Sequence, residues 1–586
     1  MLSTFLDFTC HPTIMLNSKL TTPRSTMRRS LLASLMTVVF ASHSLSAIAA
    51  NAPANNPNTP IAKAPKLVLV LVVDGLPNEQ VQRYRHQFGE GGFKRLMEQG
   101  AWFGNAHQAH GITVTAVGHS AVLTGAYPYQ HGIIGNTWFD PRTSTSVYCT
   151  EDTQYSYIGT ETKPSDGTSP ANLKVSTVGD ELRYATGNRS KVLTVSGKDR
   201  GAILLAGKTG TAYMLMKKNG AFASSTYYMN QHPAWHTAFH ANKPQDRFYG
   251  KQWTTMLPDA AYHDDAHDDI VAPANSNSSK RLPYVYDSAS GKPDAEYYEK
   301  LFTGPYVDEL TLDFASAAMD GEKLGNNPSG ATDVLGVSLS SHDYVNHMWG
   351  PESKMSHDHL QRLDRLLAKF LNEVDKKVGL ENTLVVLTAD HGFANTPEFS
   401  QSMRRDANRL DGSKFSAALN QHLQEKFGVE KLIRKWSAPY FFFDYSKAEA
   451  KGITRTEVEN AAAHFMLNHN GVATTYTRTQ LEQGALPNDR ISRLMQRAWH
   501  KQLSGDLMVV VKPYWYFGST NSGTSHGTPY TYDTNVPLMI MGKPWIKAGA
   551  YGQYAEVMDI APTLSHLLRI RLPSGSEGRA LTEILK

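Results

Sequence analysis

Four continuous apolar segments along the chain predict buried β-strands. They consist mainly of apolar residues, many of them leucine or β-branched, with few polar residues between them, which is typical of strands covered on both faces. The segments are residues 66–73, 331–339, 383–388 and 536–541. Helical patterns such as residues 357–374 lie between them. This alternation predicts an α/β domain with a doubly wound, mostly parallel central sheet flanked by helices.

Two long stretches depart from this pattern. Residues from about 140 to 320 and from about 396 to 531 are rich in Tyr, Trp, Asn, Ser, Gly and Pro, and they contain only short periodic runs. We expect both stretches to be insertions that form a cap over the core. Residues 66–586 are therefore predicted to form one domain with two insertions.

The first 50 residues have the pattern of a leader. From Met27 a basic start is followed by a short apolar segment, residues 31–40, and by small residues up to Ala50, which together predict a cleavable signal peptide. The apolar segment is much shorter than the about 20 residues of a spanning helix, so no stable membrane insertion is expected. We predict an exported protein, periplasmic or at the cell surface, with residues 51–65 as a flexible lead-in.

Composition narrows the class of protein further. Of 586 residues, 41% are hydrophobic and 19% are charged, which excludes disordered and fibrous classes. Cys10 lies in the leader, so Cys149 is the one cysteine of the mature chain and no internal disulfide is expected. The net charge of +4 includes the basic leader, and it predicts no nucleic-acid partner.

Carboxylates and imidazoles gather at the ends of the predicted strands. Because ligands of open α/β sheets bind outside the carboxyl ends of the strands, these side chains are candidates for one site. A mixture of Asp and His suits zinc, whereas calcium and magnesium favour oxygen ligands throughout. The candidate metal ligands are Asp74, Asp343, His347, Asp390, His391 and His526.

Each candidate ligand also has an ordinary interpretation. Asp74 before Gly75 fits a turn, and Asp343 with His347 fits an i, i+4 pair on a helix. Asp390 and His391 fit a loop that ends a strand. Their joint placement at one edge of the predicted sheet is what favours a metal site.

Thr115 is the candidate nucleophile. It stands at the polar start of a short predicted helix that Gly125 closes, where an N-cap residue is expected. The same position meets free backbone N–H groups and the positive end of the helix dipole, which bind phosphate. A threonine hydroxyl needs a metal or a base to become a good nucleophile. Capping and catalysis both remain open from the residues alone.

Seven short motifs give the chain a family resemblance. The motifs are Asp-Gly at 74–75, Thr-Ala-x-Gly-His at 115–119, Gly-Asn-x-Trp-Phe-Asp at 135–140, Lys-Asp-Arg-Gly-Ala at 198–202, Asp-x-x-x-His at 343–347, Ala-Asp-His-Gly at 389–392 and Ser-His-Gly at 525–527. In this order they resemble the motifs of the alkaline phosphatase superfamily. More narrowly, they resemble those of the exported bacterial phosphatases, with a threonine nucleophile, that are related to type I phosphodiesterases and nucleotide pyrophosphatases.

The resemblance implies a phosphate monoester hydrolase with two Zn²⁺ ions, acting on small-molecule monoesters through a phosphothreonine intermediate on Thr115. It implies that Asn136, Lys198 and Arg200 contact phosphate and distinguish monoesterases from diesterases. One zinc is expected on Asp343, His347 and His526. The other is expected on Asp74, Asp390 and His391, beside Thr115.

Three other functions compete with this prediction. A phosphodiesterase or nucleotide pyrophosphatase would use the same ligands and threonine, but Lys198 and Arg200 argue against it. A sulfatase needs Cys or Ser in a C/S-x-P-x-R context, and Cys149 is followed by Thr-Glu-Asp. A catalytically silent zinc- or phosphate-binding protein is the third. The remaining histidines near the motifs, His107, His110, His119 and His342, are expected to support the ligands or to be structural, although His342, next to Asp343, could substitute as a ligand.

Overall fold

The computed structural model describes residues 63–267, 281–518 and 522–586. The predicted leader, residues 1–50, and residues 51–62 of the predicted lead-in lie outside the described residues. None of the described helices combines the length and the apolar character needed to span a membrane.

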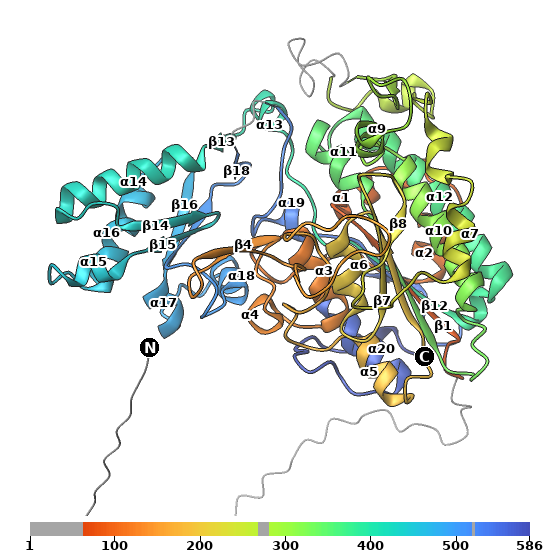
Figure 1. Cartoon of the computed structure of the whole chain (residues 1–586). Coiled ribbons are helices and arrows are strands. Elements are labelled where there is room, and N and C mark those ends of the chain that lie inside the picture. The colour runs from red at the N-terminus through yellow and green to blue at the C-terminus, as the bar shows by residue number, and fades with distance from the viewer. Residues whose placement is uncertain (1–62, 268–280, 519–521) are drawn as a thin grey trace, which may run out of the picture. The chain divides into compact units, whose positions relative to one another are not determined.

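A nine-stranded sheet is the centre of the described chain (Figure 1), in the order β20-β2-β19-β12-β1-β11-β6-β7-β8. The pairs that join β12, β1, β11, β6 and β7 are parallel, whereas β19 and β8 run antiparallel to their neighbours. The strands are β1 Leu67–Val73, β2 Ala101–Phe103, β6 Val192–Ser196, β7 Thr211–Leu215, β8 Phe222–Ala223, β11 Asp333–Leu339, β12 Thr383–Thr388, β19 Leu538–Met541 and β20 Gly549–Tyr551.

Helices cover both faces of this sheet, which confirms the predicted α/β class. Figure 1 shows α10 (Tyr306–Glu322) and α12 (Lys354–Lys377) on one side and α3 (Thr115–Thr124) and α6 (Asp199–Ala206) on the other. α12 contains the predicted helix 357–374. It begins where the Ser353 side chain accepts a hydrogen bond from the backbone N–H of Ser356, as an N-cap does.

The apolar segments locate the central strands well. β1, β11 and β12 fall within residues 66–73, 331–339 and 383–388, and all their residues are buried. The fourth segment, residues 536–541, forms β19, which is antiparallel to β12 rather than parallel. A continuous apolar run reports burial on both faces and carries no information about strand direction.

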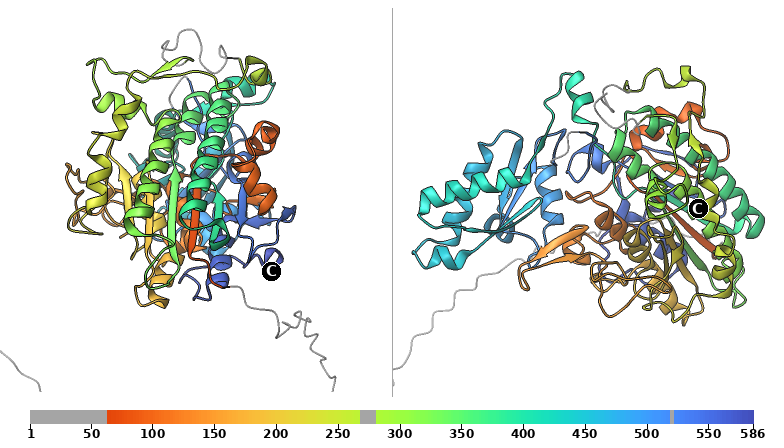
Figure 2. Two further views of the ribbon diagram at one scale, coloured as in Figure 1. Left: turned by 90° about the vertical axis from the view of Figure 1, so that its right-hand side faces the viewer. Right: turned by 45° about the horizontal axis from the view of Figure 1, so that its top comes forward.

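A second, antiparallel sheet lies within residues 396–531. It has the order β14-β15-β17-β16 and packs with α14 and α16 around a core of its own, drawn in cyan and blue in Figures 1 and 2. Its elements are α14 Gly412–Phe427, β14 Ile433–Ser437, β15 Tyr440–Phe443, α15 Tyr445–Glu449, α16 Arg455–Leu467, β16 Val472–Thr477, α17 Arg478–Gln483, α18 Arg490–Ala498 and β17 Leu507–Val511.

Residues 140–320 contribute to the central sheet, because β6, β7 and β8 lie there. Composition alone therefore does not separate inserted segments from sheet strands in this stretch, and the boundaries of both insertions stay a proposal. The other helices are α1 Asn78–Arg83, α2 Phe93–Gln99, α4 Pro128–His131, α5 Val178–Ala185, α7 Ala234–His240, α9 Ala295–Lys300, α11 Ser341–Trp349, α13 Pro397–Ser402, α19 Thr531–Thr534 and α20 Ile560–Leu568.

The remaining strands form small two-stranded pairs: β3 with β21, β4 with β5, β9 with β10 and β13 with β18. Their bounds are β3 Ala106–His107, β4 Thr137–Asp140, β5 Thr145–Tyr148, β9 Gln252–Trp253, β10 Tyr284–Val285, β13 Asn408–Leu410, β18 Trp515–Phe517 and β21 Ala555–Glu556.

Candidate active site

The carboxyl ends of three neighbouring strands bring the predicted ligands together. Asp74 directly follows β1, and its backbone N–H donates to the carbonyl of Leu339 at the end of β11 (2.9 Å). Gly75 donates its backbone N–H to Asp390 Oδ1 after β12 (3.0 Å). Gly75 has φ +71°, and a Cβ atom there would lie 3.0 Å from the Asp343 Cα. A glycine is therefore needed for this close approach.

Helix α11 carries Asp343 in its first turn and His347 in its last. Their i, i+4 spacing places His347 Nε2 3.4 Å from Asp343 Oδ1. Both side chains thus lie on the face of α11 that points to the ends of β1 and β12.

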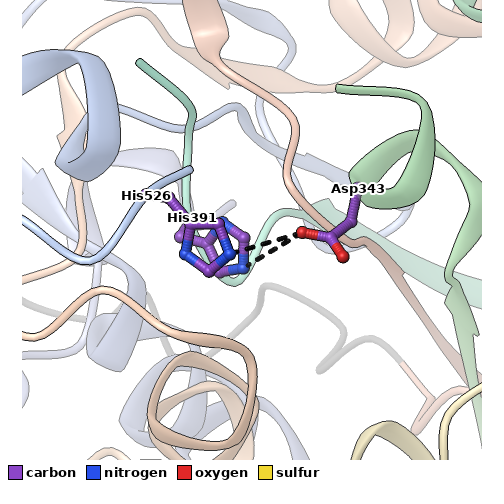
Figure 3. A group of neighbouring side chains, drawn as sticks. All are labelled: Asp343, His391 and His526. Atoms are coloured by element: carbon purple, nitrogen blue, oxygen red, sulfur yellow. Dashed lines mark ion pairs between the residues drawn. The ribbon is translucent and has the colours of Figure 1, made fainter. Parts of the chain in front are cut away.

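All three candidate imidazoles are oriented by backbone carbonyls. The Nδ1–H groups of His347, His391 and His526 donate to the carbonyls of Thr524 (2.9 Å), Gly392 (2.9 Å) and Thr113 (2.7 Å), respectively. Each hydrogen bond leaves Nε2 as the nitrogen available to a ligand. Figure 3 shows His391 and His526 stacked, with both rings directed at Asp343; their Nε2 atoms lie 3.9 and 3.5 Å from Asp343 Oδ1.

Two groups of side chains within the described residues could each hold a metal ion. In each group the three ligand atoms lie within 4.8 Å of one another. The first, Asp74, Asp390 and His391, is the set expected beside Thr115. The second contains Asp343 and His526 as expected, with His391 as its third member. His347 Nε2 is also close to this second group, at 3.4 Å from Asp343 Oδ1.

Several buried polar atoms in these groups have no hydrogen-bond partner among the described residues. An unpaired buried polar atom costs about 1–3 kcal/mol, so several at one place indicate a missing ligand. Oxygen and imidazole nitrogen together are donors that zinc accepts. These side chains therefore fit divalent metal ions. The atoms are Asp74 Oδ1, Asp343 Oδ1, Asp390 Oδ2 and His391 Nε2.

The charges of the site favour metal binding. Burial lowers the pKa of His391 to about 3 and that of His347 to about 4, so both rings are neutral near pH 7, as metal ligands must be. Burial also lowers the pKa of His526, but the neighbouring Asp343 outweighs burial and the net pKa is raised. Burial and the nearby Asp390 raise the pKa of Asp74 well above its ordinary value.

Lys198 lies between the two groups. Its Nζ is 2.7 Å from Asp74 Oδ2 and 2.6 Å from Asp343 Oδ2, which leaves the Oδ1 atoms of both carboxylates facing the imidazoles. Burial would lower the pKa of Lys198, but Asp343 and Asp74 outweigh burial and raise it above its ordinary value. The side chain is therefore an ammonium group. Two of its three N–H donors meet carboxylates, and the third remains for another acceptor.

Thr115 was predicted to be an N-cap residue, but it is the first residue of α3 and lies one position inside the helix. Val114 is the N-cap residue and provides no side-chain hydrogen bond to the helix. His119 links Thr115 to the candidate ligand Asp390, since its Nδ1 lies 2.9 Å from the Thr115 carbonyl and 3.1 Å from Asp390 Oδ2. A Cβ atom on Gly118 would lie 2.0 Å from the Asp390 carbonyl oxygen, so α3 packs directly on this ligand.

Asn136 approaches the same helix end. Its Oδ1 accepts a hydrogen bond from the backbone N–H of Ala116 (2.8 Å), so a side chain from another segment supplies the acceptor that Val114 lacks. This bond directs the amide N–H₂ group of Asn136 away from the helix. The hydrogen-bond donors of Asn136 thus remain for a ligand beside Thr115.

Arg200 is held by a tyrosine that the sequence motifs do not include. The Tyr148 hydroxyl accepts from Arg200 Nη1 (3.3 Å) and donates to Asp199 Oδ1 (2.6 Å). Arg200 Nε is buried and has no hydrogen-bond partner among the described residues. Lys198 and Arg200 line one cavity of 600 Å³, whereas Asn136 lines a neighbouring cavity of 220 Å³.

The remaining histidines have structural partners. His342, although next to Asp343, lies 3.0 Å from His359 through Nδ1 and 2.8 Å from Gln80 Oε1 through Nε2. His107 and His110 bond to Thr534 and Gln108. His119 was expected to support the candidate ligands or to be structural, and it contacts the candidate ligand Asp390; Tyr148 was not predicted at all. The i+4 spacing of His119 from Thr115 could have indicated its position; no local pattern indicates Tyr148.

Comparisons with known proteins agree with this geometry. Residues 68–534 match the family "Type I phosphodiesterase / nucleotide pyrophosphatase". A protein of Myroides odoratus named calcium-transporting ATPase is 35% identical over 525 residues, covering 89% of this chain and 95% of that protein. Alkaline phosphatase PafA of Elizabethkingia meningoseptica is 35% identical over 524 residues, covering 89% and 94%.

A solved structure supports the same relationship. The crystal structure of wild-type alkaline phosphatase PafA has a TM-score of 0.81 to this chain at 33% identity, covering 90% of this chain and 100% of that one. The family match spans most of the chain and includes every predicted ligand. The chain belongs to the type I phosphodiesterase/nucleotide pyrophosphatase family of the alkaline phosphatase superfamily.

Proposed function

We propose that this chain is an exported alkaline phosphatase that hydrolyses phosphate monoesters through a phosphothreonine intermediate on Thr115. The observation that carries the proposal is the group of unpaired buried ligand atoms on Asp74, Asp343, Asp390 and His391, with Lys198 between them. The similarity to alkaline phosphatase PafA supports the reaction. Residues 27–50, with their leader pattern, support export.

Two Zn²⁺ ions are the proposed cofactors. Asp74, Asp390 and His391 would hold one ion beside Thr115, and Asp343, His347 and His526 would hold the other. When bound, such ions make a hydroxyl more acidic and stabilise negative charge on the oxygens of an in-line phosphoryl transfer. His391 is a member of both groups of side chains that could hold a metal ion. The hydrogen bond from its Nδ1–H to the Gly392 carbonyl, which orients the ring, should therefore affect the geometry of both groups.

Thr115 performs the first half of the reaction. Its hydroxyl oxygen bonds to phosphorus while the bond from phosphorus to the ester oxygen breaks, and the alcohol leaves with the proton that Thr115 loses. In the second half, water attacks phosphorus and the bond from phosphorus to the Thr115 oxygen breaks. Phosphate leaves and the threonine hydroxyl is restored.

The charges around the site favour a monoester over a diester. A monoester dianion carries one more negative charge than a diester, and charge-assisted hydrogen bonds to it are strong. The unpaired Nε of Arg200, the third donor of Lys198 and the amide of Asn136 are the groups that would bind its nonbridging oxygens. A phosphodiesterase is the alternative, because the family name includes that activity.

The name of the Myroides relative adds a substrate to test. A calcium-transporting ATPase hydrolyses a terminal phosphate of ATP, and that phosphate carries the same charge as a monoester. ATP hydrolysis with and without Ca²⁺ therefore belongs in the substrate panel. We expect hydrolysis that does not depend on Ca²⁺.

The proposal is tested by kcat/KM for an aryl phosphate monoester and for the matching methyl diester. We expect a preference for the monoester, and we expect Arg200→Ala to reduce monoester hydrolysis by about 100-fold while the diester changes little. Thr115→Ala is the control for the nucleophile and should abolish turnover of both. A wild-type preference for the diester would overturn the monoesterase assignment.

A further inference from the structure

A small apolar cavity adjoins the candidate active site. It has a volume of 160 Å³ and lies between the central domain and the second sheet. One wall is formed by Gly111, Ile112 and Val114, immediately before Thr115, and by the loop that begins at His526. The other wall includes Met495 of α18 and β17. The second sheet and α18 thus form one wall of a cavity whose other wall belongs to the candidate active site.

The lining of this cavity offers little to a polar ligand. No Asp, Glu, Lys or Arg is among the described residues that line it. The hydroxyl of Thr528 donates to Asp533 Oδ2 (2.6 Å), and that of Tyr516 donates to the Gly523 carbonyl (3.0 Å). His526 bonds to the Thr113 carbonyl through Nδ1. The groups that remain in contact with the cavity are aliphatic and aromatic.

The groups proposed to bind phosphate oxygens lie elsewhere. Lys198 and Arg200 line the cavity of 600 Å³, and Asn136 lines the cavity of 220 Å³; none of the three lines the apolar cavity. In an in-line displacement the attacking and leaving oxygens lie on opposite sides of phosphorus, apart from the nonbridging oxygens. His526 belongs to the proposed ligands that are not the set beside Thr115, and it lines the apolar cavity. We therefore assign the cavity to the side of the leaving oxygen.

The volume of the apolar cavity limits the size of the group that it can bind. An apolar protein cavity of about 150 Å³ binds benzene. The cavity of 160 Å³ therefore matches one six-membered ring or an alkyl chain of about six carbons.

We propose that this cavity binds the alcohol part of the substrate and makes the enzyme selective for monoesters of apolar alcohols. This inference rests on the proposed function. It assigns the second sheet a role in specificity, because β17 and α18 supply the wall that faces His526.

The test is kcat/KM for a series of n-alkyl phosphates from methyl to octyl. Primary alkanols have nearly equal acidities, so differences along the series report binding of the alkyl chain rather than chemical reactivity. We expect kcat/KM to rise by about fourfold per methylene until the cavity is filled at about six carbons, and then to level off. Equal values along the whole series would overturn the inference.

Variants identify which cavity is used. Met495→Ala removes three side-chain heavy atoms from the wall and should move the plateau by about three carbons. Met495→Val is a milder substitution that should give a smaller shift in the same direction. The matched control is Phe442→Leu, at a residue that lines the cavity beside Asn136 and does not line the apolar cavity; it should leave the plateau in place.

The outcomes separate the inference from the proposed function. If Phe442→Leu moves the plateau and the Met495 variants do not, the alcohol binds beside Asn136 and the inference is wrong. If the wild-type enzyme hydrolyses methyl phosphate but shows no chain-length dependence, the proposed function stands without this subsite. If it hydrolyses no monoester at all, both fail.

Discussion

Hydrogen bonds from the backbone determine which atoms of the site face a ligand. Three backbone carbonyls fix the Nε2 atoms of His347, His391 and His526, and Lys198 occupies one oxygen of Asp74 and one of Asp343. Asp74 Oδ1, Asp343 Oδ1 and His391 Nε2 have no hydrogen-bond partner among the described residues. Orientation of metal ligands by such neighbours commonly changes metal affinity by about 10- to 100-fold.

Tyr148 gives a prediction at this scale. We expect Tyr148→Phe to lower kcat/KM for monoesters by about fivefold, because the loss of one hydrogen bond of about 1 kcal/mol leaves the Arg200 guanidinium less well positioned. Diester hydrolysis should change little, since Arg200 serves the extra charge of a monoester. The measurement is the monoester-to-diester ratio for the wild type, Tyr148→Phe, Arg200→Ala and the double variant.

A purely structural role of Tyr148 would give a different result. Both substrates would then lose activity to the same extent, and the effects of the two substitutions would add. If Tyr148 acts through Arg200, it should have no further effect once Arg200 is alanine.

The sequence predicts individual ligands better than their supporting contacts. Asp74, Asp390 and His391 could be predicted as candidate ligands because they follow apolar strands within three residues, and the ends of parallel strands meet at one edge. Thr115 was expected as an N-cap but lies one position inside the helix, since helix ends depend on contacts such as Asn136 with Ala116. Tyr148 could not be predicted because it reaches Arg200 only through tertiary structure.

At the scale of the elements, three histidines pack against the edge of the central sheet. Helix α7 and the residues before it place three histidines against the outer strand β8. The backbone N–H groups of Phe222 and Ser224 donate to Nε2 of His240 (3.3 Å) and His232 (3.0 Å), and His236 Nε2 donates to the Phe222 carbonyl (2.7 Å). These imidazoles satisfy the backbone groups that an edge strand otherwise exposes.

These histidines predict that the stability of this sheet edge depends on pH. His240 and His232 accept hydrogen bonds and must be neutral, and burial lowers the pKa of His240 to about 4 and also lowers that of His232. The unfolded state takes up a proton below about pH 6.5, whereas the folded state does not, so stability is lost as the pH falls from about 6.5 towards 4. We expect hydrogen-exchange protection at Phe222 and Ser224 to fall over this range while protection of β1 persists.

A matched variant tests the cause. His240→Gln keeps a hydrogen-bond acceptor for the Phe222 N–H but does not titrate, so protection at Phe222 should become less dependent on pH. If the wild type and this variant lose protection at Phe222 in parallel, the imidazole of His240 is not responsible.

The direction of a strand and the sheet to which it belongs were harder to predict than its position in the sequence. The segment 536–541 was recognised as a strand, but its antiparallel pairing with β12 depends on the path of the chain through the second sheet. β6 to β8 lie in a stretch whose polar and aromatic composition suggested an insertion. Continuous apolar segments identify buried strands, whereas the order of strands in a sheet depends on long-range packing.

For the whole molecule, the site depends on segments that are far apart in the sequence. Asp74 and His526 both contribute. They meet because β1, β11 and β12 are adjacent in the sheet and the loop that contains His526 packs against Thr113.

Removal of the metal gives a prediction at the same scale. Several candidate ligand atoms are buried and have no hydrogen-bond partner among the described residues, so bound metal should stabilise the fold as well as support catalysis. Chelation is therefore expected to lower both the melting temperature and the activity.

The central claim is that six side chains hold two divalent ions against Thr115. They are those of Asp74, Asp343, His347, Asp390, His391 and His526. It is tested most directly by elemental analysis of the purified, active enzyme by inductively coupled plasma mass spectrometry. We predict two zinc ions per chain, with Asp390→Ala retaining fewer. Full phosphatase activity in wild-type protein that contains no bound transition metal would contradict the account.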